Sequence, residues 1–120
     1  MKVKVILAAV LFMTSFAWIT KTCLAKEEPY RVTIKDHVFI PAELVVPANK
    51  KFKLIIKNED LTPEEFESYD LNREKIVTGN GTITLFIGPL KEGEYKYFGE
   101  FHQETAQGII KAEEITIRKE

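Results

Sequence analysis

The chain has 120 residues, enough for one domain, and 45% of them are hydrophobic. Its 18 acidic and 17 basic residues give a formal net charge of −1 at pH 7. A balance that is not basic argues against nucleic acid and anionic membrane surfaces as partners, and we expect neither.

Residues 1–25 have the pattern of a secretory signal peptide. Two lysines open the segment, an apolar stretch occupies residues 5–19, and small residues precede a cleavage point after Ala25. The stretch is shorter than the roughly 20 apolar residues that a retained membrane anchor needs. A lipoprotein acylated at Cys23 is disfavoured by the polar residues before that cysteine. We therefore expect an exported protein.

The domain that remains after cleavage, residues 26–120, has no cysteine, methionine or tryptophan. It therefore has no disulfide, thiolate or thioether, and it must fold around a hydrophobic core alone. All 18 acidic residues but only 14 of the 17 basic ones lie in this part, so its net charge is −4 with histidine neutral. An acidic domain of this kind is compatible with binding cations.

Alternating apolar and polar residues predict β-strands along most of this domain. β-Branched and aromatic side chains occupy every second position in four runs, at residues 30–35, 51–57, 82–87 and 95–97. A last run contains Ile109-Ile110 and Ile115-Thr116-Ile117. The segment from Glu43 to Val46 lies between two prolines, which suits an edge strand because proline cannot donate to a ladder.

Turn dipeptides separate these runs. Asn80-Gly81, Gly88-Pro89 and Glu92-Gly93 each follow or precede an alternating stretch. Several short strands at this spacing, in a chain of this length, predict an all-β fold, a Greek-key β-sandwich.

One segment, residues 62–76, leaves two alternatives open. Thr62-Pro63-Glu64-Glu65 is a capping box with proline at the first helical position, which favours the start of a helix. From Glu65 to Tyr69 the same segment also alternates as a strand would. We expect a short helix or an irregular segment here, with helix or strand undecided for residues 63–68.

Two stretches of the domain resemble the cupredoxins. One runs from Lys57 to Glu67 and begins with an Asn-Glu-Asp turn after a strand. The other, Pro89 to Gly108, is similar to the family's Pro-Gly-x-Tyr-x-Tyr-x-Cys-x-x-His region. Residues 39–41 and 46–50 look like the family's early strand and turn. The resemblance covers nearly all of the domain and implies a cupredoxin-like sandwich.

The copper ligands of that family are not kept. A blue-copper centre needs two imidazoles and a thiolate, with a weak axial ligand that is often methionine. The matching positions hold other residues: Gly99 for the cysteine, Glu64, Glu65 or Glu67 for the first histidine, and Ala106 or Gln107 for the methionine. Only His102 remains, so blue-copper electron transfer is excluded.

Three stretches look closest to the EfeO-type branch of the superfamily: Glu65 to Ser68, Leu71 to Lys75 and Glu100 to Ala106. That branch is associated with bacterial iron uptake. The resemblance implies a periplasmic protein that works with an inner-membrane iron permease.

The predicted metal ligands are His102, Glu67, Glu65 and Glu100. Glu100 and His102 lie two apart on an expected strand, so their side chains point to one face. If the acidic segment packs beside this loop, as cupredoxin topology implies, Glu65 and Glu67 converge there. An imidazole with several carboxylates favours iron or Cu(II), whereas Cu(I) would find no sulfur. The plainer alternative is a set of solvent-exposed glutamates beside a turn histidine.

Three further residues are weaker candidates. Glu74 and Glu104 could add oxygen ligands to the same site. We expect His37 to be a turn residue outside the site, where with Asp36 it could make a second, weak surface contact with a metal.

We therefore predict a periplasmic metal-binding accessory protein that handles iron, or with less support copper, for a bacterial uptake system. The rival is a metal-free β-sandwich module that docks on a membrane transporter or another envelope partner. The sequence has no serine elbow, phosphate loop or Cys-His pair, so we predict no enzyme. A ferroxidase-like step is conceivable because oxygen ligands favour Fe(III), but no residue demands it.

Overall fold

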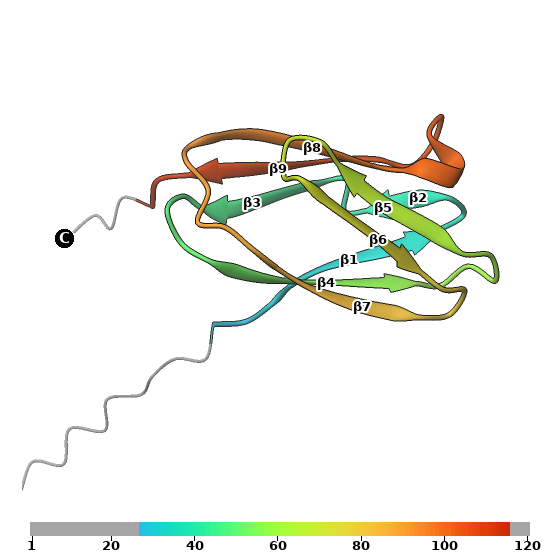
Figure 1. Ribbon diagram of the computed structural model, residues 1–120. Coiled ribbons are helices and arrows are strands. Elements are labelled where there is room, and N and C mark those ends of the chain that lie inside the picture. The colour runs from blue at the N-terminus through green and yellow to red at the C-terminus, as the bar shows by residue number, and fades with distance from the viewer. Residues whose placement is uncertain (1–26, 116–120) are drawn as a thin grey trace, which may run out of the picture.

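The computed structural model describes residues 27–115, which form two β-sheets packed face to face (Figure 1). The predicted signal peptide, its cleavage point after Ala25 and the Thr116-Ile117 end of the last predicted run lie outside the described residues. Within residues 27–115, no helix has the length and hydropathy needed to cross a bilayer.

Four strands form one sheet and five form the other. The first sheet has the order β2-β1-β4-β7, with β1 (Tyr30–Lys35), β2 (Val38–Ile40), β4 (Phe52–Asn58) and β7 (Thr82–Ile87). The second has the order β3-β9-β8-β5-β6, with β3 (Glu43–Pro47), β5 (Glu64–Ser68), β6 (Arg73–Val77), β8 (Gly93–Gly99) and β9 (Gln107–Glu113). A 3₁₀ turn, η1 (Glu100–His102), follows β8.

Both sheets are mixed. β1 pairs in parallel with β4 and β3 pairs in parallel with β9, while the other ladders are antiparallel. The predicted all-β sandwich is confirmed. β3 lies at the edge of its sheet, as its flanking prolines predict.

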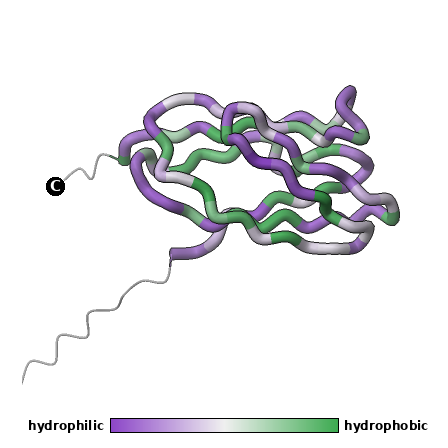
Figure 2. Tube along the Cα trace, viewed as in Figure 1, coloured by the Kyte–Doolittle hydropathy of each residue, from purple (hydrophilic) through white to green (hydrophobic). Residues whose placement is uncertain are grey.

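The period-two pattern places one side of each sheet in the core. In β4 and β7 every second residue is buried, and the hydropathy along the chain alternates accordingly (Figure 2). Because the two inner faces interdigitate, seventeen hydrophobic residues of the described part of the chain form one core between the sheets.

Three aromatic rings fill the core near one end of the sandwich. Phe39, Phe66 and Tyr97 contact one another with ring centroids 5.0 to 6.4 Å apart. The Tyr97 ring lies over Gly108, where a Cβ atom would overlap it. Its hydroxyl has no hydrogen-bond partner among the described residues, and burial raises the pKa of this phenol, so it stays protonated.

The segment 62–76 forms a β-hairpin and contains no helix. β5 and β6 pair antiparallel, joined by a turn at residues 69–72, so the expected short helix or irregular segment is replaced by strands. The strand alternative for residues 63–68 holds because β5 also pairs with β8. Hydrogen bonds to strands on both sides outweigh a local capping box, whose contribution is about 1 kcal/mol.

The end of β8 also differs from the expectation. The strand stops at Gly99, and Glu100 and His102 lie in η1 instead of on a strand. Their spacing of two therefore does not put both side chains on one face.

Candidate metal centre

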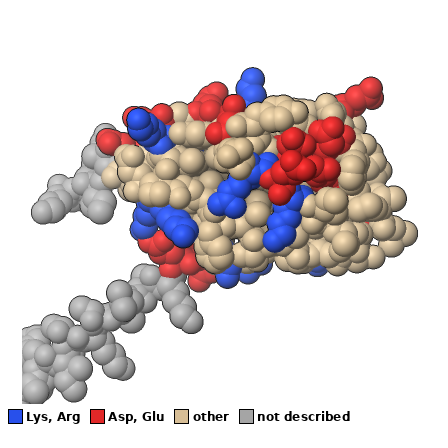
Figure 3. All heavy atoms as spheres, in the orientation of Figure 1, with Lys and Arg blue, Asp and Glu red and all other residues tan. Residues whose placement is uncertain are grey.

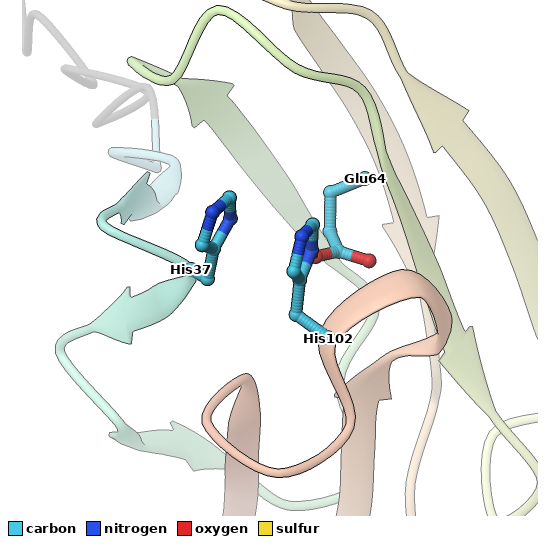
Figure 4. Close-up of side chains that lie close together, drawn as sticks. All are labelled: His37, Glu64 and His102. Carbon is cyan, nitrogen blue, oxygen red and sulfur yellow. The ribbon is translucent and has the colours of Figure 1, made fainter.

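Three side chains meet at one end of the sandwich: His37, Glu64 and His102 (Figure 4). Each offers a ligand atom, and these atoms all lie within 4.8 Å of one another. His37 comes from the turn between β1 and β2, Glu64 begins β5, and His102 ends η1. The four-stranded sheet thus supplies one imidazole, and the five-stranded sheet supplies the carboxylate and the other imidazole.

Glu64 is a buried carboxylate, with only 1% of its surface exposed. Its Oε1 atom accepts hydrogen bonds from the backbone N–H groups of Phe101, at 2.9 Å, and of Glu65, at 3.0 Å. Its Oε2 atom lies 2.6 Å from Nδ1 of His102. A carboxylate can be buried when its oxygens are satisfied in this way, and here the three partners fix its orientation.

Gly99 makes room for this carboxylate. A Cβ atom at position 99 would lie 2.6 Å from Cδ and 2.8 Å from Oε1 of Glu64. The Glu64 carboxylate therefore occupies the space into which any side chain at position 99 would extend.

His102 is held by a closed loop between β8 and β9. The Gly99 N–H donates to the Ala106 carbonyl at 2.9 Å, and the Ala106 N–H donates to the His102 carbonyl at 2.8 Å. The side chain of His102 is 29% exposed, and its Nδ1 atom faces Glu64.

His37 stacks on His102, with ring centroids 3.5 Å apart and an angle of 11° between the planes. It lies in a two-residue turn with Asp36, since Lys35 pairs with Val38 across the hairpin. Both turn residues have positive φ, 51° for Asp36 and 61° for His37. Such turns favour Asn-Gly, so placing histidine second costs about 1 kcal/mol and presents an imidazole where glycine would be easier.

The structure separates His102 from the other three predicted ligands, which gather elsewhere. His102 lies in the site, but Glu65 and Glu67 point from β5 to the opposite side from Glu64, because successive strand residues alternate. They gather with Glu74 in an acidic cluster over β5 and β6 (Figure 3). Glu100 lies close enough to both to raise their pKa values, so it belongs with this cluster.

The pKa values of Glu65 and Glu67 are raised above those of ordinary glutamates. Partial loss of hydration contributes most, followed by the neighbouring carboxylates: Glu74 and Glu67 act on Glu65, Glu74 acts on Glu67, and Glu100 acts on both. The cluster is therefore a repulsive patch on the outer face of its sheet.

Sequence reasoning missed His37 and did not single out Glu64. His37 was expected outside the site, yet it supplies one of the three converging side chains. Two signals point to these residues. Asp36-His37 is a two-residue turn between alternating runs. Glu64 lies two residues before buried Phe66, so the two side chains point to the same side once β5 is accepted as a strand.

The donor set is two imidazoles and one carboxylate, in place of the expected single imidazole with several carboxylates. It does not fit a blue-copper centre, because position 99 offers no thiolate and the adjoining space is filled by Glu64. It does fit ions that accept nitrogen and oxygen ligands, which include iron, Cu(II) and zinc.

Comparison with known proteins identifies the type of domain. The family described as cupredoxin-like domain matches residues 5–112. An uncharacterised protein of Rickettsia prowazekii (strain Madrid E) is 55% identical over 80 residues, which are 67% of this chain. The chain spans 64% of the length of that relative.

Solved structures share the fold at low sequence identity. Auracyanin A, a blue copper protein of Chloroflexus aurantiacus, aligns with a TM-score of 0.62 and 15% identity over 72% of this chain and 98% of its own. Amicyanin of Paracoccus versutus aligns with a TM-score of 0.58 and 16% identity, over 72% of this chain and 82% of its own. A purple cupredoxin of Nitrosopumilus maritimus aligns with a TM-score of 0.56 and 18% identity, over 70% of this chain and 99% of its own.

Proposed function

Because this chain belongs to the cupredoxin-like domain family and gathers two imidazoles around a buried carboxylate, we propose that it is a metal-binding accessory protein. Its cargo is a transition metal ion, iron or Cu(II). His37 and His102 supply nitrogen ligands and Glu64 supplies oxygen.

The convergence of three ligand atoms within 4.8 Å carries this proposal. An ion pair between Glu64 and His102 would satisfy a purely structural role. It would not require His37, whose side chain is 40% exposed and which lies in a turn of unfavourable φ. His37 packs on the ring of His102, and beside the buried carboxylate it also offers the second nitrogen ligand that a metal ion would use.

The ligand chemistry selects the class of ion. Imidazole suits iron, copper and zinc, and a carboxylate shifts the preference towards harder, more oxidised ions. Residues 26–120 contain no sulfur, so Cu(I) has no favourable ligand in this domain. Zn(II) fits the same donor set, so the choice of Fe(II), Fe(III) or Cu(II) as cargo rests on the resemblance to iron-uptake domains as well as on the ligands.

The cellular setting is part of the proposal. The signal-like residues 1–25 support export to the periplasm, and the resemblance to EfeO-type domains supports a role in bacterial iron uptake. In this setting the protein would deliver its ion to an inner-membrane iron permease.

Metal titration of the purified domain, residues 26–120, tests the proposal. We expect binding of one ion per chain, measured by calorimetry and metal analysis with Fe(II), Fe(III), Cu(II) and Zn(II). His37→Ala and His102→Ala should each weaken it at least tenfold, because each removes a ligand. Glu67→Gln, in the acidic cluster, is the control and should leave affinity unchanged.

Other results would contradict this site. Equal affinity in all four proteins would place any binding elsewhere in the chain. Loss of binding in Glu67→Gln alone would move the site to the acidic cluster, as the sequence suggested. No binding by the unsubstituted domain would refute the function.

A metal-free interaction module remains the second candidate, favoured by exposed apolar side chains near the site. Leu61 is 86% exposed in the loop after β4, and Phe101 is 47% exposed beside His102. Salt separates the two functions. The acidic cluster of Glu65, Glu67 and Glu74 would supply charged contacts to a basic partner. Docking through these charges weakens with ionic strength, whereas chelation weakens mainly on acidification, as imidazole and carboxylate take up protons.

A further inference from the structure

Asp60 lies outside the three converging side chains but contacts the turn that carries His37. It sits in the loop between β4 and β5, where buried Asn58 holds it in place. Oδ1 of Asn58 accepts from the Asp60 N–H at 3.0 Å, and Nδ2 of Asn58 donates to the Thr62 carbonyl at 2.8 Å. The Asp60 backbone is thus fixed to the end of β4.

The Asp60 carboxylate makes three contacts with the β1–β2 turn. Its Oδ1 atom accepts from the Asp36 N–H at 2.8 Å, and its Oδ2 atom accepts from the His37 N–H at 3.0 Å. Oδ2 also lies 3.5 Å from Nδ1 of His37. Only 14% of the Asp60 side chain is exposed.

A fourth contact holds the other side of the turn. Oγ1 of Thr105 donates to the His37 carbonyl at 2.6 Å. The left-handed conformation of His37 is therefore imposed from two loops, one on each side. A structural hairpin with Asn-Gly at the turn would need no such clamp.

We propose that Asp60 is the positioning residue of the metal site. It holds the β1–β2 turn in its left-handed conformation and accepts the Nδ1 proton of His37, so that His37 offers Nε2 to the metal. A metal-bound histidine commonly donates its other N–H to a carboxylate in this way, which fixes the tautomer and the ring orientation. This inference rests on the proposed metal-binding function.

Asp60→Asn tests the inference, with Asp70→Asn as the matched control. Asp70 also accepts a backbone N–H from another strand, that of Lys96 at 2.8 Å, but it lies in the β5–β6 turn. Zn(II) is the probe, because it is diamagnetic and binds imidazole and carboxylate. Its affinity is measured by calorimetry, and the tautomer of each histidine by ¹⁵N NMR.

We expect the unsubstituted protein to hold His37 with its proton on Nδ1 and Zn(II) on Nε2. Asp60→Asn should lose about 10- to 100-fold in Zn(II) affinity and show a mixture of His37 tautomers. Asp70→Asn should match the unsubstituted protein in both measurements. A loss of stability alone would not change the tautomer of His37 in the folded protein. The NMR result therefore distinguishes a positioning role of Asp60 from a role in folding.

Two outcomes overturn the role of Asp60 while leaving the metal site in place. One is Zn(II) bound to Nδ1 of His37 in the unsubstituted protein, a measurement that needs no variant to fold. The other is equal affinity in the two aspartate variants. If the folded, unsubstituted protein binds no Zn(II), Fe(II), Fe(III) or Cu(II), the proposed function fails and this inference fails with it.

Discussion

At the scale of single residues, the site depends on two complementary residues, Gly99 and Glu64. A glycine at position 99 opens space beside the β8 backbone, and the carboxylate of Glu64 fills that space. The buried carboxylate is then satisfied by two backbone N–H groups and by His102. A side chain at position 99 would displace this carboxylate.

Gly99→Ala should therefore remove the carboxylate from the site. The added Cβ would lie 2.6 Å from Cδ of Glu64 and 2.7 Å from Cβ of Ala106, so Glu64 must move. We expect a loss of about 2 kcal/mol in the free energy of unfolding, typical of overpacking, and at least a tenfold loss of metal affinity. Chemical denaturation and calorimetry measure the two effects.

Gly108→Ala is the control for this substitution. Its Cβ would overlap the ring of Tyr97, away from Glu64. It should cost comparable stability and leave the affinity of the folded protein for metal within about twofold. If the two variants lose metal affinity equally, the effect belongs to general loosening of the core.

At the scale of elements, β5 presents two chemically different sides. Its inward side carries Glu64 with Phe66 and Ser68, all buried, while Glu65 and Glu67 point outward and meet Glu74 of β6. β5 thus contributes Glu64 to the candidate metal site and Glu65 and Glu67 to the acidic cluster on the surface. Because the carboxylates of the outer cluster repel one another, this cluster opposes folding at neutral pH.

This repulsion predicts an unusual pH dependence. The pKa of Glu67 in the folded protein is raised, so the folded state binds protons more readily than the unfolded state. The contribution of Glu67 to stability therefore improves as pH falls through its raised pKa and levels off below the ordinary value. Glu67→Gln should raise the thermal midpoint at pH 7 and lose this advantage near pH 4.

Thermal unfolding of both proteins across this pH range checks the prediction. Glu94→Gln is the control, since Glu94 lies 3.9 Å from the ammonium group of Lys111 and not beside another carboxylate in the acidic cluster. It should give no gain at pH 7. A gain of equal size in Glu94→Gln would attribute the effect to overall charge.

At the scale of the whole molecule, the candidate site joins the two sheets. His37 follows β1 of the four-stranded sheet, whereas Glu64 and His102 belong to the five-stranded sheet. Without metal, the contacts at this end include the stacked imidazoles, the packing of Phe39 on Phe66 and Tyr97, and the bonds from Asp60 and Thr105 to the turn. A bound ion would link the sheets directly.

Metal should therefore stabilise the fold as a whole. At a free metal concentration 100 times Kd, linkage adds about 2.7 kcal/mol to the free energy of unfolding. For a domain of this size that corresponds to a rise of about 10 to 20 °C in Tm. Scanning calorimetry with and without Zn(II) measures it. The same rise in His37→Ala would show that the ion does not use the turn.

The sequence by itself determined the fold class. Strand periodicity, turn dipeptides and the proline-flanked edge strand are local features, because each depends on the backbone preferences of neighbouring residues. The absence of cysteine in residues 26–120 likewise excluded a blue-copper centre without any structure. His102 could be predicted as a ligand because it stands three residues after Gly99, in the stretch that resembles the Cys-x-x-His region of the cupredoxins.

Only the tertiary structure decided the partners of His102. The face on which Glu64, Glu65 and Glu67 lie depends on whether residues 64–68 form a strand, and pairing with β6 and β8 made that choice. His37 is 65 positions from His102 in the chain, so only the packing of the two sheets brings their rings to 3.5 Å. This metal site needs ligands placed by long-range packing, and local sequence patterns do not contain the distances between them.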